Sequence, residues 1–189
     1  MSFKQKRSVQ KNGFTMIELL VVIVILGILS VIGLSSLGSA QVKARDSRRK
    51  TDLRTIGDSL ELYYNDFGRY PASDGNGVIM GCGVAAAEAC SSGVIWQNSD
   101  NGTTYMVQMP EDPGGGRYYY ITSPTGSYFQ IYARLENNRD RDVPQDPSGT
   151  SLEYVNPYAE QGASACIIGD CNYGESSTNI DLGQTQEGD

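Results

Sequence analysis

A run of 24 residues without a charged side chain, from residue 19 to residue 42, constrains this chain more than any other feature. The run is rich in Leu, Ile and Val and contains no Pro. At about 1.5 Å per residue, a helix of this length extends roughly 36 Å, which exceeds the thickness of about 30 Å of a bilayer hydrocarbon core. The sequence therefore predicts a membrane-length helix.

A single carboxylate, Glu18, lies just inside the apolar segment, and a basic, acid-free leader precedes it. An ionised Glu at membrane depth is unfavourable by several kcal/mol unless it is paired, so it marks a functional position. A second interpretation is that Glu18 caps the start of the helix, where its charge faces the positive end of the helix dipole. The position alone leaves both interpretations open.

The sequence from Gly13 through FTMIELL (residues 14–20) resembles the class III signal of type IV pilins and type II secretion pseudopilins. The resemblance implies that residues 1–13 are a leader, that prepilin peptidase cleaves between Gly13 and Phe14, and that the new N-terminus on Phe14 is methylated. One departure is that many relatives carry a proline near the position of Ser35.

Cleavage would create a positively charged amine on Phe14. In a helical bundle of such subunits, Glu18 of one subunit can pair with the amine of another, which neutralises a charge that is unfavourable when buried. We therefore expect Glu18 to serve in the assembly of a homo-oligomeric helical filament.

The helix is expected to continue past the apolar run. Apolar residues recur at steps of three and four from Leu53 to Phe67, and Gly68 and Pro71 then provide stop signals. The sequence predicts one helix from about Thr15 to about Phe67. Its half over residues 14–42 would lie in the membrane or the filament core, and its amphipathic half over residues 43–67 would pack on a small sheet.

The clearest strand pattern lies in residues 117–122 and 128–135, two runs rich in Tyr and apolar residues joined by a turn with glycine. Such runs predict an antiparallel hairpin. The expected fold class is α+β and pilin-like, with a long N-terminal helix on a small antiparallel β head formed by residues 68–171. Residues 172–189 have almost no apolar content and are expected to be a mobile tail.

Charge is distributed in blocks. From residue 55 onward there are 19 acidic and 5 basic residues, a net charge of −14. This composition disfavours a nucleic-acid partner, which requires clusters of Lys and Arg.

Both flanks of the apolar run are basic, so the positive-inside rule does not orient it. The leader and the cysteines favour a single-pass precursor in the cytoplasmic membrane, with the head outside and exposed on the cell surface or in the periplasm after assembly.

Four cysteines allow three pairings. We favour two local disulfides, Cys82 with Cys90 and Cys166 with Cys171, in an oxidising compartment. Zinc is the competing interpretation, but the cysteine spacing does not match typical sites and the chain contains no His.

The loop over residues 136–149 carries three aspartates, Asp140, Asp142 and Asp146. Pseudopilins, which the chain resembles, can bind calcium in a loop that follows the sheet, and carboxylate oxygens are suitable ligands. No full EF-hand pattern occurs, and arginines interleave with the acids, so a solvated turn is the alternative. Apart from this calcium candidate, no cofactor is expected. Because the chain lacks His and a phosphate-binding loop, we also expect no catalytic site.

The sequence therefore favours a structural pilin that polymerises through its N-terminal helix into a type IV pilus, served by prepilin peptidase and the inner-membrane pilus assembly machinery. One alternative is the pseudopilin of a type II secretion system. Another is a monomeric membrane-anchored adhesin or binding protein, which would have no special need for Glu18.

Overall fold

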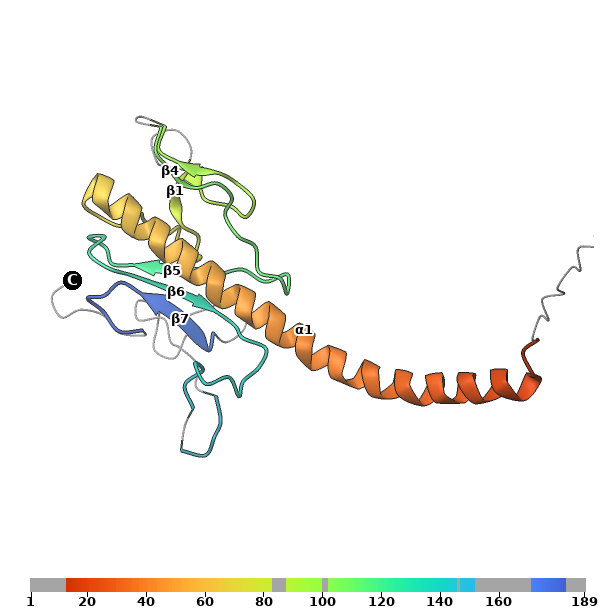
Figure 1. Ribbon diagram of the computed structural model, residues 1–189. Coiled ribbons are helices and arrows are strands. Elements are labelled where there is room, and N and C mark those ends of the chain that lie inside the picture. The colour runs from red at the N-terminus through yellow and green to blue at the C-terminus, as the bar shows by residue number, and fades with distance from the viewer. Residues whose placement is uncertain (1–12, 83–87, 100–101, 146, 152–170, 183–189) are drawn as a thin grey trace, which may run out of the picture. The chain divides into compact units, whose positions relative to one another are not determined.

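The computed structural model describes residues 13–82, 88–99, 102–145, 147–151 and 171–182, and for residues 31–36 it describes the backbone only. The chain divides into two compact units, residues 1–41 and residues 42–189. Helix α1 (Met16–Phe67) runs through the boundary between them (Figure 1). The predicted single helix is therefore confirmed, and its start differs from the expected one by a single residue.

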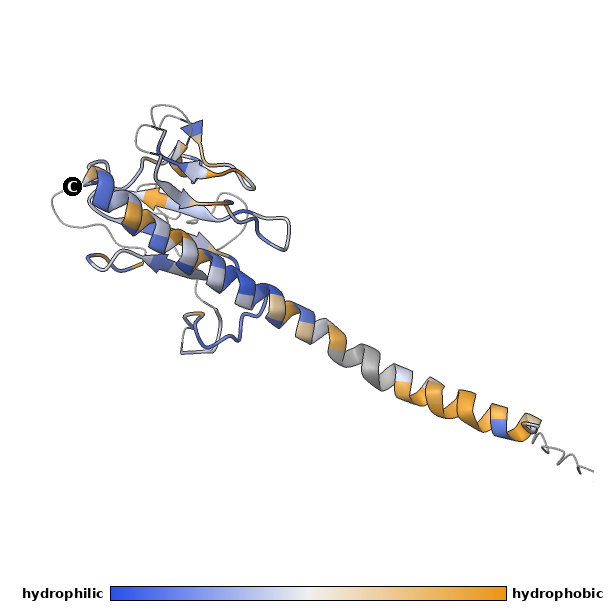
Figure 2. Ribbon diagram, turned by 45° about the horizontal axis from the view of Figure 1, so that its top comes forward, coloured by the Kyte–Doolittle hydropathy of each residue, from blue (hydrophilic) through white to orange (hydrophobic). Residues whose placement is uncertain are grey.

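The described part of the first unit is mainly the N-terminal part of α1, whose coloured residues are mostly hydrophobic (Figure 2). Side chains are exposed at residues 13–30 and again at residues 37–40. Among the described residues, no helix reaches the combined length and apolar character of a membrane span. The membrane-spanning role expected for residues 14–42 stays a prediction.

The C-terminal end of α1 is set by Gly68. Its backbone has a φ of 69°, in the left-handed region, and its N–H donates to the carbonyl of Tyr64 at 2.7 Å. This is the αL capping arrangement, in which a glycine satisfies a carbonyl that the last turn leaves unpaired. The chain then turns into the head through Pro71, as the stop signals predict.

The second unit contains three small antiparallel sheets. Strand β1 (Met80–Cys82) pairs with β2 (Glu88–Ala89), and β3 (Trp96–Gln97) pairs with β4 (Thr104–Met106). The third sheet has the order β5 (Tyr119–Thr122), β6 (Phe129–Ala133) and β7 (Tyr173–Ser176). The predicted hairpin is confirmed by β5 and β6, whose register pairs Tyr120 with Ile131.

The main core lies between the C-terminal half of α1 and these strands. The apolar stripe of the helix buries four side chains completely or nearly so: Leu53, Ile56, Leu60 and Tyr63. They belong to one cluster with aromatic and apolar residues of the head, including Trp96, Tyr105, Tyr120, Phe129 and Ile131. The stripe from Leu53 to Tyr63 therefore packs inside the head, whereas Tyr64 and Phe67 are exposed. The α+β, pilin-like fold expected from the sequence is confirmed.

The structure corrects the prediction of a mobile tail over residues 172–189. Residues 173–176 form β7, which pairs with β6, and Tyr132 of β6 lies opposite Gly174. The alternation in β6 predicts one face in the core and one face outside, yet all five of its residues are buried. Tyr119, Ile121, Tyr132 and Cys171 form a second small core, against which Leu182 packs. The tail prediction fails because backbone pairing and this second core compensate for the low apolar content of the segment. Residues 183–189 lie outside the described residues.

Candidate assembly and processing site

The first turn of α1 is closed by a reciprocal pair of hydrogen bonds between Thr15 and Glu18. The Glu18 carboxylate accepts from the Thr15 backbone N–H at 3.1 Å and from the Thr15 hydroxyl at 2.9 Å. The Glu18 backbone N–H in turn donates to the Thr15 Oγ1 at 3.3 Å. This is a capping box, in which Thr at the N-cap and Glu three residues later satisfy each other's backbone donors. The Thr-x-x-Glu spacing at residues 15–18 is a sequence signal for it.

The capping box places the carboxylate of Glu18 at the very start of the helix. The predicted cleavage between Gly13 and Phe14 would leave the new amine on the residue that precedes Thr15, so the carboxylate and the amine would belong to the same turn. The side chain of Phe14 is 84% exposed. The capping role is therefore present within one chain, whereas cleavage, methylation and the assembly role of Glu18 remain predictions.

Large apolar side chains cover every side of the N-terminal part of α1. A helix that is apolar all round is normally buried, either within protein or in lipid. Here the large apolar side chains among residues 14–29 have exposed fractions from 49% at Val21 to 94% at Met16. They are Phe14, Met16, Ile17, Leu19, Leu20, Val21, Val22, Ile23, Val24, Ile25, Leu26, Ile28 and Leu29. Such an exposed apolar segment is typical of a surface that binds another protein or a membrane.

In the second unit, α1 is joined to two loops of the head through the guanidinium of Arg49, which is 3% exposed. Its Nη1 donates to Asp46 at 2.7 Å and to Glu136 at 2.8 Å. Its Nη2 donates to Asp112 at 2.9 Å. Arg45 adds a bond of 2.7 Å from its Nε to Glu136. We refer to Arg45, Asp46, Arg49, Asp112 and Glu136 as the Arg49 network.

Backbone donors complete the Arg49 network. The carboxylate of Asp46 accepts the N–H groups of Glu136 and Asn137, each at 2.9 Å. Hydrogen bonds from Arg45, and then from Arg49, outweigh partial burial and lower the pKa of Glu136 to about 2. Burial opposes the charge of Arg49, but its bonds to Asp112 and Glu136 outweigh this and raise the pKa of Arg49. The network thus fixes the head loops to the helix through ion pairs of Arg49. Nothing local in the sequence marks Arg49, because its partners Asp112 and Glu136 lie far from it along the chain.

The candidate calcium residues are brought together, but around a lysine. Nζ of Lys50 lies 2.5 Å from Asp140 and 2.7 Å from Asp142. Burial lowers the pKa of Lys50, but the hydrogen bonds to Asp140 and Asp142 outweigh it, so the net effect raises that pKa. Asp146 lies outside the described residues. Within the described part of the chain, no group of three or more His, Cys, Asp or Glu residues could hold a metal ion. Asp140 and Asp142, the two candidates that the structure describes, therefore face a lysine and do not fit a calcium ion.

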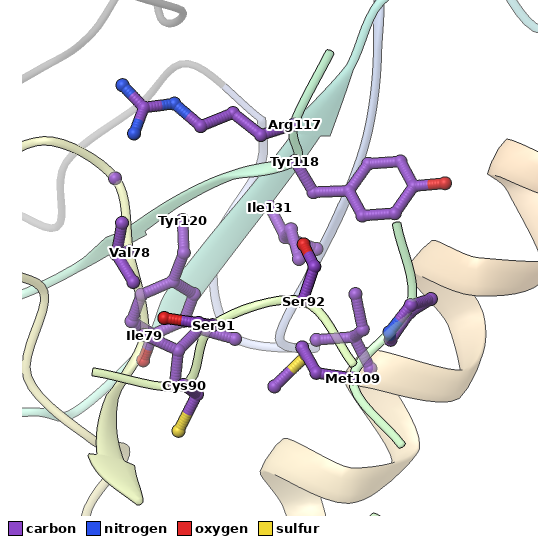
Figure 3. A pocket seen from close by; sticks show the side chains of 13 residues that line it. Val78, Ile79, Cys90, Ser91, Ser92, Met109, Arg117, Tyr118, Tyr120 and Ile131 are labelled. Carbon is purple, nitrogen blue, oxygen red and sulfur yellow. The ribbon is translucent and has the colours of Figure 1, made fainter. Parts of the chain in front are cut away.

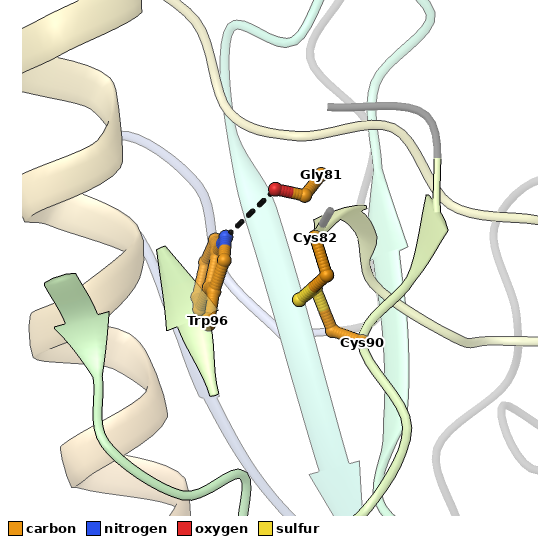
Figure 4. Close-up of a disulfide and its surroundings, with 4 residues drawn as sticks. All are labelled: Gly81, Cys82, Cys90 and Trp96. Carbon is orange, nitrogen blue, oxygen red and sulfur yellow. Dashed lines mark hydrogen bonds between the residues drawn. A yellow bond between two sulfur atoms is a disulfide. The ribbon is translucent and has the colours of Figure 1, made fainter. Parts of the chain in front are cut away.

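One disulfide, Cys82–Cys90, ties β1 to the residue that follows β2 (Figure 4). It is one of the two local pairs expected from the sequence. Both cysteines are buried, and close to them the indole N–H of Trp96 donates to the carbonyl of Gly81 at 3.1 Å. Cys171 is also disulfide-bonded, whereas Cys166 lies outside the described residues.

A cavity of about 230 Å³ lies between α1, the loop that precedes β1 and strand β5 (Figure 3). Apolar side chains such as Ile79, Met109 and Ile131 line it, together with Ser91 and Arg117. Ligand pockets usually hold about 300–1,000 Å³. The cavity is smaller than these, and we assign no ligand to it.

Two family models match the chain. The prokaryotic N-terminal methylation motif matches residues 9–34, and type II secretion system protein G matches residues 36–140. The type II secretion system core protein G of Pseudomonas aeruginosa is 31% identical over 124 residues, which cover 66% of this chain and 82% of that protein. The Aeromonas hydrophila protein of the same name is 33% identical over 119 residues, covering 62% of this chain and 76% of that protein. No solved structure matches the chain.

A methylation motif at the start of a long, exposed apolar helix, followed by a small antiparallel head, defines the class of pilin-like proteins. Within that class, the protein G model covers 105 of the 189 residues. The chain belongs to the type II secretion system protein G family. Membership of the pilin and pseudopilin group is therefore confirmed. Of the two filament types that the sequence left open, the comparisons favour the secretion pseudopilin over the type IV pilus.

Proposed function

We propose that this protein is the structural subunit of a secretion pseudopilus, a filament that copies of the chain build by packing their N-terminal helices together. The proposal replaces the type IV pilus favoured from the sequence, because the protein G family is named for the type II secretion system. The head would then lie on the outside of the filament.

The observation that supports this proposal most strongly is the exposed apolar segment of α1. Burying a Leu, Ile, Val or Phe side chain contributes about 1.5–3 kcal/mol. The segment exposes thirteen large apolar side chains within residues 14–29. Packing such helices against copies of themselves would remove this surface from water and supply the free energy of assembly.

Glu18 would serve two purposes in the proposed assembly. In the single chain it closes the first turn through Thr15. In the filament its carboxylate would also pair with the Phe14 amine of a neighbouring subunit. The pairing would compensate two charges that are unfavourable among apolar helices.

The proposed life cycle has a precursor anchored in the cytoplasmic membrane, with the leader inside and the head outside. Prepilin peptidase would remove residues 1–13 and methylate Phe14, and the assembly machinery of the inner membrane would then draw subunits into the filament. The buried Cys82–Cys90 disulfide is consistent with a head in an oxidising compartment. The role is structural rather than catalytic, and the acidic head argues against a nucleic-acid partner.

The test has two parts, both done in the native bacterium. The first is the intact mass of the protein, which we expect to begin at Phe14 and to carry one added methyl group. The second is the amount of secreted protein in the culture medium after deletion of the gene. We expect secretion to fall while surface pili remain, and a plasmid copy to restore it.

Three outcomes would contradict parts of the proposal. A chain that still begins at Met1 would contradict processing. Loss of surface pili with normal secretion would return the assignment to a type IV pilus. A processed protein that stays monomeric in the membrane would favour the anchored binding protein.

A further inference from the structure

The loop that follows β6 is held by a lysine in the place where calcium was expected. Lys50 reaches this loop from α1, and its Nζ lies between the carboxylates of Asp140 and Asp142, at 2.5 and 2.7 Å. The Lys50 side chain is 16% exposed, and the side chains of Asp140 and Asp142 are 23% and 33% exposed, so the contact is partly shielded from solvent.

Several further contacts make this a built site rather than a chance surface pair. The Asp142 backbone N–H donates to the Asp140 carboxylate at 3.0 Å, and the Val143 N–H donates to the Asp140 carbonyl at 3.1 Å. Val143 is buried in the main core. The Lys50 ammonium also lies 5.6 Å from the centre of the Tyr173 ring, within the range of a cation–π contact.

A calcium ion and this ammonium exclude each other. Calcium requires six to eight oxygen ligands at about 2.3–2.6 Å. The oxygens of Asp140 and Asp142 that would supply two of them already face a positive charge at hydrogen-bonding distance. A divalent ion placed there would be repelled by the ammonium, and Lys50 would have to leave a partly shielded position and lose both of its partners.

We propose that the Lys50 ammonium takes the place of a divalent cation in the loop over residues 136–145. The loop is then ordered by this ammonium and does not require a bound metal ion. The inference is independent of the proposed function, because it concerns the folded head before assembly. It contradicts the calcium site expected from the resemblance to pseudopilins.

The test uses the full chain in detergent micelles, compared in excess EDTA and in about 5 mM calcium, which exceeds the Kd of about 10⁻³ M of weak protein sites. Two quantities are measured: the Tm, and the rate of amide hydrogen exchange over residues 136–145. We expect the Tm of the wild type to agree within about 1 °C in the two conditions, with equal exchange rates.

Lys50→Met keeps the apolar stem of the side chain and removes the charge. In EDTA we expect it to lower the Tm by several degrees and to speed exchange in the loop about tenfold. Lys43→Met is the matched control, because Lys43 is an exposed lysine on the same helix, and it should behave like the wild type.

Either of two results would overturn the proposal. One is a wild-type Tm that rises by several degrees in calcium, with slower exchange in the loop. The other is a Lys50→Met variant whose loop exchanges like the wild type in EDTA. If that variant fails to fold, the comparison of the wild type in EDTA and calcium still decides. Because both measurements use unassembled protein, their failure is distinct from a failure of the secretion test.

Discussion

At the scale of single residues, the Arg49 guanidinium holds together parts of the head that are distant in sequence. Its partner Asp112 is separated from it by 63 residues and Glu136 by 87. Buried ion pairs contribute little net stability compared with apolar residues, but removing one partner leaves the others charged and unpaired. The Arg49 network is therefore most sensitive to the loss of its central cation.

Arg49→Ala is expected to lower the free energy of unfolding by about 3–5 kcal/mol, because Asp46 and Asp112 would stay buried without their cation. Thermal unfolding of the full chain in detergent, followed by the near-UV signal of buried Trp96, measures this loss. The control is Arg48→Ala at the neighbouring position, where the side chain is 63% exposed and lies 3.8 Å from Asp52. That change should remain within about 0.5 kcal/mol of the wild type, and equal effects of the two variants would contradict the account.

Glu136 predicts a specific dependence of stability on pH. Its pKa in the folded head is about 2, below its ordinary value of 4.5. A carboxyl with a lowered folded pKa contributes stability that is present above its unfolded pKa and is lost as pH falls toward the folded value. The stability difference between the wild type and Glu136→Gln should thus be constant above about pH 5.5 and shrink between about pH 4.5 and pH 2. Denaturation curves across this range measure it, and a constant difference would contradict the assignment.

At the scale of secondary-structure elements, the close contact between β6 and β7 depends on a glycine. A Cβ on Gly174 would lie 2.8 Å from the Tyr132 ring and 2.9 Å from the Ile131 carbonyl oxygen. Because the second contact involves backbone of the paired strand, a side chain there would push the strands apart. By contrast, a Cβ on Gly57 in α1 would meet only Phe129, at an ordinary 3.8 Å.

The same substitution should therefore have opposite effects at these two glycines. Gly174→Ala is expected to destabilise the head by about 1–3 kcal/mol through overpacking. Gly57→Ala should stabilise it by roughly 0.5–1 kcal/mol, because alanine loses less backbone freedom than glycine in a helix. Paired thermal unfolding curves test the contrast. A stable Gly174→Ala variant would mean that β7 is not held against β6 as described.

The elements that sequence predicts well are those whose signals are local. The spacing of apolar residues from Leu53, with Gly68 at the end, predicts the helix correctly. Two Tyr-rich apolar runs joined by a turn with glycine predict the β5–β6 hairpin correctly. The third strand was missed because Tyr173–Ser176 is short and polar and gains its stability by pairing with β6. The roles of Arg49 and Lys50 have no local signal for a similar reason, since their partners include distant acids that only the fold brings near.

At the scale of the whole molecule, the two units differ in where their large apolar side chains lie. The first exposes an apolar helix, and the second has its own core, a disulfide and fixed ion pairs. A head that is complete in itself and a helix that requires a partner are the features we expect of a subunit that folds before it assembles. The protein G family match extends from residue 36, near the end of the apolar segment, into the head.

The charge of Glu18 is expected to be required for assembly in addition to the role of Glu18 in capping α1, and two variants separate these effects. Glu18→Gln removes the charge but preserves a capping box, because Gln also serves at that position. Thr15→Ala weakens the cap, with an expected effect of about 0.5–2 kcal/mol on the helix, but retains the charge. The measurement is the yield of filaments, recovered as cross-linked multimers from cells that express each processed variant at equal levels, together with the amount of secreted protein in the medium. We expect Glu18→Gln to abolish filaments and Thr15→Ala to retain most of them, whereas normal yields from Glu18→Gln would contradict the claim.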